Sequence, residues 1–183
     1  MLHLYFLHKR IHETMRFIKA TEKEIPLIQE LAKDSWENAY QDILSAGQIT
    51  YMLDTMYSYE EILGHLQNPC YHYYLIQDQS DDRFMGFIGY ENRYEGAEDT
   101  TKLHRIYLVP GYKGKGAGKE ALEFLHGEVQ KTGSGRIILN VNKHNPAIKF
   151  YESQGYRVYG EGIFDIGNGY FMDDYLMEFL IHK

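Results

Sequence analysis

The sequence is poor in cysteine and proline and contains no long hydrophobic run. Its 183 residues include one cysteine and four prolines, so no intramolecular disulfide can form and a cysteine-based metal cage is excluded. No stretch approaches the roughly 18 apolar residues that a transmembrane helix needs. The short apolar run near the amino terminus is interrupted by histidine and precedes its basic residues, unlike a secretory signal peptide. We therefore expect a reducing, cytoplasmic location.

Basic residues are also fewer than acidic ones. The sequence has 19 Lys and Arg against 26 Asp and Glu, which leaves a net charge of −7. Such a charge argues against a non-specific nucleic-acid surface and favours cationic or amine-bearing partners. Hydrophobic residues make up 44% and charged residues 25%, as is typical of globular proteins. Composition therefore indicates a globular protein with a preference for cations.

The length of 183 residues predicts one domain with its own core. The first strand-like run begins after Met15. We therefore predict an N-terminal extension over residues 1–14 and a single domain over residues 15–183.

Local patterns predict helices in the first third of the chain and two more later. Thr21 and Glu24 form a capping-box pattern ahead of apolar residues at helical spacing, and Ser58 and Glu61 repeat that pattern. Asn145 followed by proline predicts the start of a short helix that Gly155 ends. The predicted helices cover residues 25–36, 48–57, 59–66, 114–131 and 146–154.

Runs rich in tyrosine, isoleucine and phenylalanine predict strands between these helices. The predicted strands cover residues 16–19, 71–77, 84–90, 103–109, 136–141, 156–164 and 171–181. The first two long runs are separated by turn residues and are expected to form a hairpin. The whole order predicts an α/β fold in which a mixed, mostly antiparallel sheet carries helices on both faces.

A glycine-rich segment at residues 113–119 follows one predicted strand and opens a helix. Its glycines allow close approach of the backbone to a ligand, while its lysines and the helix start supply positive potential, so the segment predicts a phosphate-binding site. The P-loop pattern fails because Lys113 and Glu120 stand at its first glycine and its hydroxyl position. The dinucleotide pattern is met only formally, because the acidic residue expected at the end of the next strand is missing.

The same segment resembles motif A of the GNAT superfamily of N-acetyltransferases, since Lys113, Gly116 and Gly118 fill the motif's places. Lysine at the first place departs from the usual Gln or Arg and lacks a planar donor group. Downstream, residues 142–156 resemble motif B of that family. The predicted strand order also fits the family fold over residues 15–183.

The resemblance implies that acetyl-CoA lies between two splayed parallel strands, here residues 103–109 and 136–141, and that no metal is needed. Backbone groups of one strand would pair with the pantetheine arm, and the glycine-rich segment would hold the pyrophosphate. The implied cofactor-binding residues are Ile106, Tyr107, Leu108, Lys113, Gly114, Lys115, Gly116, Ala117, Gly118, Lys119 and Asn145.

Two residues are implied to carry the chemistry. Tyr151 matches the family tyrosine that protonates the departing sulfur; a packed aromatic is the alternative. His104 stands where several relatives carry a glutamate, and its reference pKa near 6.5 suits a base; a packed or exposed strand histidine is the alternative. A base is useful because an alkylamine with a pKa near 10.4 is almost wholly protonated at pH 7, a cost of roughly 4 kcal/mol.

The sequence gives weaker evidence about the amine that accepts the acetyl group. The segment around Trp36 and Tyr40 and the tail around residues 167–177 look similar to bacterial polyamine-type acetyltransferases, so a small polyamine-like amine attacking acetyl-CoA directly in a ternary complex is the leading expectation. Acetylation of protein N-termini or lysines remains open, as does a module that binds acetyl-CoA without turnover. Exposed sheet edges would also allow a homodimer.

Overall fold

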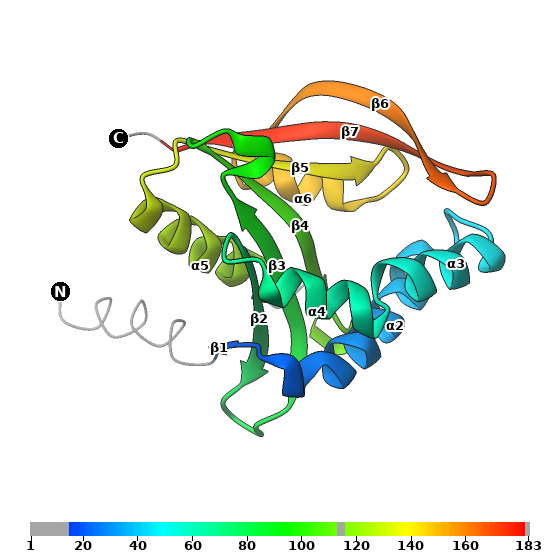
Figure 1. The fold of residues 1–183 in the computed structure, drawn as a ribbon, viewed down its shortest axis with the longest axis horizontal. Coiled ribbons are helices and arrows are strands. Elements are labelled where there is room, and N and C mark those ends of the chain that lie inside the picture. Colours follow the sequence, from blue (N-terminus) through cyan, green and yellow to red (C-terminus); the bar gives the residue numbers. More distant parts are fainter. Residues whose placement is uncertain (1–14, 113–115, 182–183) are drawn as a thin grey trace, which may run out of the picture.

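The computed structural model describes residues 15–112 and 116–181. A seven-stranded sheet runs through these residues in the order β1-β2-β3-β4-β5-β7-β6, and only β4 and β5 pair in parallel (Figure 1). The strands are β1 (Met15–Lys19), β2 (Tyr71–Asp78), β3 (Phe84–Asn92), β4 (Thr100–Leu108), β5 (Arg136–Asn142), β6 (Arg157–Gly167) and β7 (Tyr170–Leu180). The predicted α/β fold class is confirmed.

Helices cover both faces of this sheet. They are η1 (Glu22–Glu24), α2 (Ile25–Tyr40), α3 (Ala46–Met56), α4 (Tyr59–Gln67), η2 (Tyr94–Gly96), η3 (Pro110–Tyr112), α5 (Ala117–Thr132) and α6 (Ala147–Ser153). The helices α2, α3 and α4 bury one face around Trp36, Tyr73 and Phe87. The helix α5 and residues of α6 cover the other face around Ile88 and Leu125. None of the helices in residues 15–112 and 116–181 combines the length and apolar character needed to cross a membrane.

The predicted caps form largely as expected. The reciprocal capping box of Thr21 and Glu24 is present, whereas the Ser58 side chain only accepts a bond from the backbone of Glu61. Gly155 has the expected left-handed conformation with a φ of 88°. Helix α6 begins at Ala147 with Pro146 at the N-cap position, one residue later than predicted, and the side chain of Asn145 accepts a hydrogen bond from the backbone of Ala147 at 2.9 Å.

Several predicted boundaries differ from the structure, and the physical reason is clear for three of them. Helix α5 begins at Ala117, not at 114, because Gly116 has a φ of 87° that no helix residue adopts. Helix α3 begins two residues earlier than predicted, where Ser45 caps it. Strand β4 begins at Thr100, not at 103, because parallel pairing with β5 and burial hold a polar stretch in the sheet.

A β-bulge in β4 positions the functional region. On β3, Gly89 and Tyr90 are adjacent, but they pair with Arg105 and Leu103, so His104 is the extra residue of β4. Such a bulge bends a strand and increases its twist. The ladder between β4 and β5 ends at the neighbouring pair, Leu103 with Leu139. Beyond the bulge the two parallel strands therefore diverge, and Figure 1 shows this separation.

Candidate functional site

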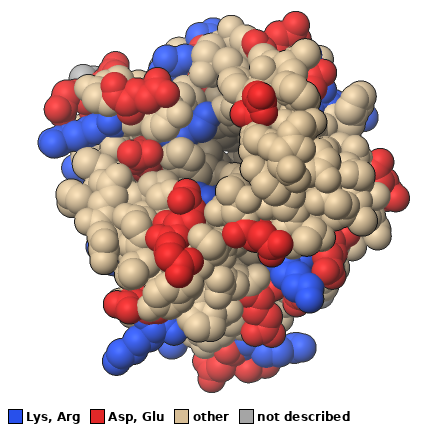
Figure 2. Space-filling model, turned by 45° about the vertical axis from the view of Figure 1, so that its right-hand side comes forward, with Lys and Arg blue, Asp and Glu red and all other residues tan. Residues whose placement is uncertain are grey.

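The space between the diverging strands is a cavity of about 150 Å³. Helix α2 lies along one side of it and the start of α6 along another. Its lining comprises Ser35, Ala39, Tyr40, Leu103, His104, Arg105, Ile106, Tyr107, Leu108, Leu139, Asn140, Val141, Asn145, Ala147 and Tyr151. In Figure 2 the surface is hollowed near the centre of the view, and acidic side chains lie beside the hollow.

The structure brings six of the thirteen predicted site residues to this cavity. Both residues predicted to be catalytic, His104 and Tyr151, line it, as does Asn145. The predicted pantetheine-binding residues Ile106, Tyr107 and Leu108 line it as well, and they belong to the part of β4 that no longer pairs with β5. Their backbone groups on that side are free of the β5 ladder and can bond a ligand.

The described part of the predicted phosphate-binding segment, residues 116–119, does not contribute to the cavity lining. Gly116, Ala117, Gly118 and Lys119 form the start of α5, directly after β4 and η3; Lys113, Gly114 and Lys115 lie outside the described residues. The first N–H groups of a helix lack intrahelical acceptors and favour anions. A side chain at position 118 would meet the Phe150 ring at 3.1 Å, which explains the glycine there by close packing of α5 on α6.

Tyr151 is a buried phenol that faces the cavity. Only 8% of the residue is exposed, and the rings of Phe150 and Tyr156 pack against it at 5.5 and 5.6 Å. Burial, followed by the nearby Tyr40, raises the pKa of Tyr151 above its ordinary value. The phenol is therefore protonated at neutral pH, and it can donate a proton or a hydrogen bond to a group in the cavity.

Tyr40 joins the walls of the cavity to one another. Burial raises the pKa of Tyr40 to about 12, while hydrogen bonds with Tyr107 of β4 and with Asn145, which precedes α6, oppose that rise. The Trp36 ring packs at 4.5 Å from the Tyr40 ring. The hydroxyl of Ser35, one turn before Ala39 on the same helix, is buried without a hydrogen-bond partner and lines the cavity. A bound ligand would supply that partner.

His104 is held by an acid and two rings. Its Nε2 lies 3.1 Å from Oε2 of Glu91, the Tyr71 ring stacks on it at 5.0 Å, and the Tyr94 ring meets it edge-on at 5.6 Å. Burial, followed by the charges of Arg105 and Lys102, lowers the pKa of His104 to about 3. The carboxylate of Glu91 acts in the opposite direction, because an anion favours the imidazolium. At pH 7 the ring is neutral, and its Nε2 is held toward Glu91.

Arg105 is a buried cation in a cage of tyrosines. Only 4% of it is exposed, it donates to the Tyr71 hydroxyl and to the Met56 carbonyl, and its guanidinium lies 5.0 to 5.9 Å from the rings of Tyr57, Tyr71 and Tyr73. Burial disfavours the charge, yet the tyrosines, Tyr71 first, leave the pKa of Arg105 above its ordinary value. The cage keeps a positive charge beside His104.

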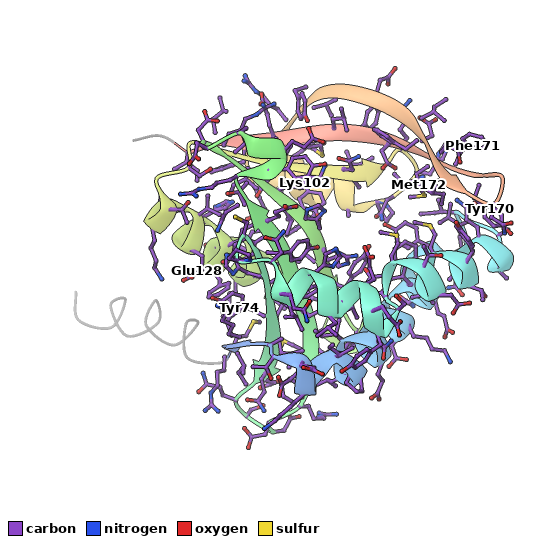
Figure 3. All side chains as sticks on the ribbon, in the orientation of Figure 1. Tyr74, Lys102, Glu128, Tyr170, Phe171 and Met172 are labelled. Carbon is purple, nitrogen blue, oxygen red and sulfur yellow. The ribbon has the colours of Figure 1, made fainter. Side chains whose placement is uncertain are left out.

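Lys102 lies on the strand segment just before the bulge, in the middle of Figure 3. It donates to the side-chain oxygen of Asn140 on β5 and lies 5.5 Å from the Tyr94 ring. Burial lowers the pKa of Lys102 to about 8, although Asp174 and Glu95 oppose that shift. Lys102 and these two acids therefore interact with one another outside the cavity lining.

Sequence reasoning missed Glu91 and Arg105 as members of this region. Glu91 lies near the end of β3, and its contact with His104 spans 13 positions. Arg105 donates hydrogen bonds to Tyr71 and Met56, which lie 34 and 49 positions before it in the chain. The local signal was weak: an arginine at a position that otherwise reads as an apolar strand. No group of His, Cys, Asp or Glu suited to hold a metal occurs in residues 15–112 and 116–181.

Comparison with known proteins identifies the chain's relatives. The model of the acetyltransferase (GNAT) family matches residues 28–156. An uncharacterised N-acetyltransferase of Lactobacillus delbrueckii subsp. lactis is 21% identical over 174 residues, which cover 92% of this chain and 96% of the relative.

Solved structures share the fold. The PaiA N-acetyltransferase of Thermoplasma acidophilum, crystallised with coenzyme A, has a TM-score of 0.73 at 24% identity and covers 90% of this chain and 98% of its own. The spermidine/spermine N-acetyltransferase SpeG of Vibrio cholerae has a TM-score of 0.65 at 17% identity, with 91% and 92% covered. The ribosomal-protein-S18-alanine N-acetyltransferase of Escherichia coli has a TM-score of 0.67 at 18% identity, with 92% and 95% covered.

The neutral histidines near Arg105 predict an acid-sensitive fold. Burial, then Arg105, lowers the pKa of His65 to about 4, and that of His104 is about 3, against about 6.5 in the unfolded chain. Between these values the unfolded state binds more protons, so the free energy of unfolding falls as pH drops below about 6.5, by up to about 1.4 kcal/mol per pH unit for each ring.

We expect the double variant His65→Gln, His104→Gln to show a shallower loss of stability between pH 6.5 and pH 4 than the parent protein. Urea unfolding at several pH values measures this difference. Parallel curves for the two proteins would show that both rings titrate alike in the folded and unfolded states.

Proposed function

Because the chain belongs to the acetyltransferase (GNAT) family, we propose that it transfers the acetyl group of acetyl-CoA to a primary amine of a small, polyamine-like acceptor. Acetyl-CoA-dependent N-acetyl transfer follows from the family and from the N-acetyltransferase relative. The acceptor and the roles of individual residues are the proposal.

One observation carries the proposal: the cavity opened by the bulge in β4 has His104 and Tyr151 in its lining, together with the unpaired edge of β4. A thioester placed along that edge would bond backbone groups of Ile106, Tyr107 and Leu108. Its carbonyl would be polarised there, while the sulfur faces the phenol of Tyr151. The buried, unpartnered hydroxyl of Ser35 supports the presence of a polar ligand in this space.

The phosphates of acetyl-CoA would lie at the start of α5. Gly116 has a backbone conformation that L side chains rarely adopt, and Ala117, Gly118 and Lys119 present the free N–H groups of the first turn. Lys113, Gly114 and Lys115, outside the described residues, would add charge and further backbone donors. Asn145, already bonded to Ala147 and Tyr40, would contact the pantetheine arm.

The reaction would proceed by direct attack in a ternary complex. The neutral amine adds to the thioester carbonyl, and the resulting ammonium loses its proton to His104, directly or through water. With a pKa of about 3, the imidazole cannot hold that proton, so the Nε2 proton passes to Glu91, 3.1 Å away. Collapse of the tetrahedral intermediate breaks the carbon–sulfur bond, and Tyr151 gives its proton to the departing thiolate.

A polyamine-like acceptor suits the charge of the chain. The net charge is −7, and acidic side chains border the hollow in Figure 2. Glu91 and Asp174 lie on β3 and β7, the strands beside β4 and β5, outside the cavity lining. The SpeG protein of similar fold acts on spermidine and spermine. Acceptors on proteins form the second candidate, favoured by the similar fold of the enzyme that acetylates an alanine of a ribosomal protein.

The first test is acetyl transfer to a panel of amines, read as release of free thiol from acetyl-CoA. We expect spermidine, spermine and diamines to give higher kcat/KM than lysine-containing or N-terminal peptides. A ligand that binds only the folded state raises the melting temperature, so acetyl-CoA and CoA should raise it where NAD and ATP do not. Turnover of peptides without turnover of polyamines would show that the acceptor is a protein amine. Binding of acetyl-CoA without transfer to any amine would show that the chain is a non-catalytic binding module.

For the acid role, Tyr151→Phe should lower kcat by roughly a hundredfold or more, since proton transfer by a positioned side chain is typically worth about 10² to 10⁴. The KM for acetyl-CoA should change little, because the lost interaction forms only as the thiolate leaves. Tyr156→Phe is the matched control: a buried tyrosine, bonded to His126, outside the cavity lining. Equal kcat in both variants would reduce Tyr151 to a packing residue.

For the base role, His104→Gln should lower kcat/KM by about tenfold or more, and Glu91→Gln should lower it by a similar factor, because no carboxylate then receives the Nε2 proton. His126→Gln serves as the control, since that half-buried ring contacts Tyr156 and Phe179. Steady-state rates from pH 6 to pH 9 measure the effect. An unchanged rate in His104→Gln across this range would show that the amine loses its proton to solvent and not to His104.

A further inference from the structure

Lys102 is a buried amine that has no part in the proposed reaction. Only 8% of the residue is exposed, and it is the one lysine among the buried residues of 15–112 and 116–181. A lysine is rarely buried unless its charge is paired. The ion pairs of lysine in this part of the chain involve Lys119, Lys131 and Lys143 instead. The Lys102 amine is therefore buried without a carboxylate in contact with it.

This environment changes the protonation of the amine. Burial lowers the pKa of Lys102 to about 8, although the charges of Asp174 on β7 and Glu95 on η2 oppose the shift. At that pH about half of the Lys102 side chains are neutral, against roughly one in 250 for a lysine with the ordinary pKa near 10.4. Hydrogen bonds, the one with Asp173 first, instead raise the pKa of Lys143. The Lys102 amine is thus a far better nucleophile near neutral pH than an ordinary lysine.

Two shared neighbours place the Lys102 amine on the same face of the sheet as His104. Lys102 pairs with Glu91 in the register of β3 and β4, and directly paired residues point to the same face. Glu91 in turn contacts Nε2 of His104 at 3.1 Å. The Tyr94 ring lies 5.5 Å from Nζ of Lys102 and 5.6 Å from the His104 ring. The amine therefore lies on the side from which the proposed base would act.

The Lys102 amine also lies directly behind the wall of the cavity. Its Nζ donates a hydrogen bond to the side-chain oxygen of Asn140 on β5, and Asn140 lines the cavity. The next residue on β4, Leu103, lines the cavity too and is the last one paired with β5. Figure 3 shows Lys102 on the part of β4 that lies next to β5. Because lysine has a flexible four-carbon stem, Nζ can exchange Asn140 for a group bound in the cavity.

We propose that Lys102 is itself acetylated by the acetyl-CoA bound in this cavity, in a reaction within one chain that needs no free acceptor. The neutral amine adds to the thioester carbonyl, and its proton leaves through His104 and Glu91. The carbon–sulfur bond then breaks, and Tyr151 gives a proton to the thiolate. The products are N-acetyl-lysine and CoA, and no oxidant or reductant is needed. The inference rests on the proposed binding of acetyl-CoA, and it is independent of which free amine the protein acetylates.

The test is incubation of the purified full-length protein with acetyl-CoA that carries an isotope-labelled acetyl group, followed by mass spectrometry of the intact chain and of its peptides. We expect one labelled acetyl group per chain, on Lys102, at a rate per chain that does not depend on protein concentration. A rate proportional to protein concentration would show transfer between chains and would overturn the proposal. Because the site is mapped in the parent protein, this result does not depend on the folding of any variant.

The pH dependence separates this reaction from chemical acetylation of exposed lysines. Labelling of Lys102 should rise up to about pH 8 and then level off, since the amine is then mostly neutral. Labelling of an ordinary lysine should continue to rise toward pH 10, near its pKa. The titratable groups that face the amine within the described residues are Glu91, Tyr94, Glu95, His104 and Asp174.

Lys102→Arg should prevent the labelling, because a guanidinium remains protonated. Lys143→Arg is the matched control and should leave the label on Lys102, since Lys143 is paired with Asp173 and Glu161. A rise in melting temperature with acetyl-CoA would show that each variant is folded and binds the donor. Equal labelling of Lys143, or amine turnover without any label on Lys102, would overturn this inference alone. A parent protein that acetyl-CoA does not stabilise would overturn the proposed function as well.

Discussion

The bulge at His104 is the constraint on which the functional region depends. Up to Leu103 the parallel strands β4 and β5 share a ladder, and one residue later the register of β4 shifts against β3 and the ladder with β5 is over. A regular β4 would continue to pair with β5 and would leave no space between them. The extra residue thus opens the cavity. It also leaves the backbone groups of β4 beyond Leu103 without hydrogen-bond partners on β5.

The same bulge decides which side chains face which partners. Arg105 and Tyr107 on one side of β4 contact the residues under α2 and α4, whereas Ile106 and Leu108 on the other side contact those under α5. A buried guanidinium is costly unless it is bonded and surrounded by groups that favour it. The tyrosines around Arg105 supply this environment without a carboxylate, which leaves the acid Glu91 to His104. The bulge in β4 therefore determines which polar partners Arg105 and His104 contact.

Much of the fold follows from local sequence. The capping box at Thr21 and Glu24, the left-handed Gly155 and the runs of β-branched and aromatic residues each depend on neighbours within a few positions, and these predictions agree with the structure. The start of β4 does not follow from local sequence. Thr100, Thr101 and Lys102 are polar, and only their pairing with β5 and their burial make them part of a strand.

The sequence by itself determined the order of the elements, the glycine-rich start of α5 and the identity of the residues that resemble the family motifs, because these features lie within short stretches of chain. Only the tertiary structure decided that His104 is a bulge residue bonded to Glu91, that Tyr40 and Tyr151 meet across one cavity, and that Lys102 is a buried amine. The physical reason is that register, burial and strand order are set by contacts between residues far apart in the chain, and a pattern of neighbouring residues contains no record of those contacts.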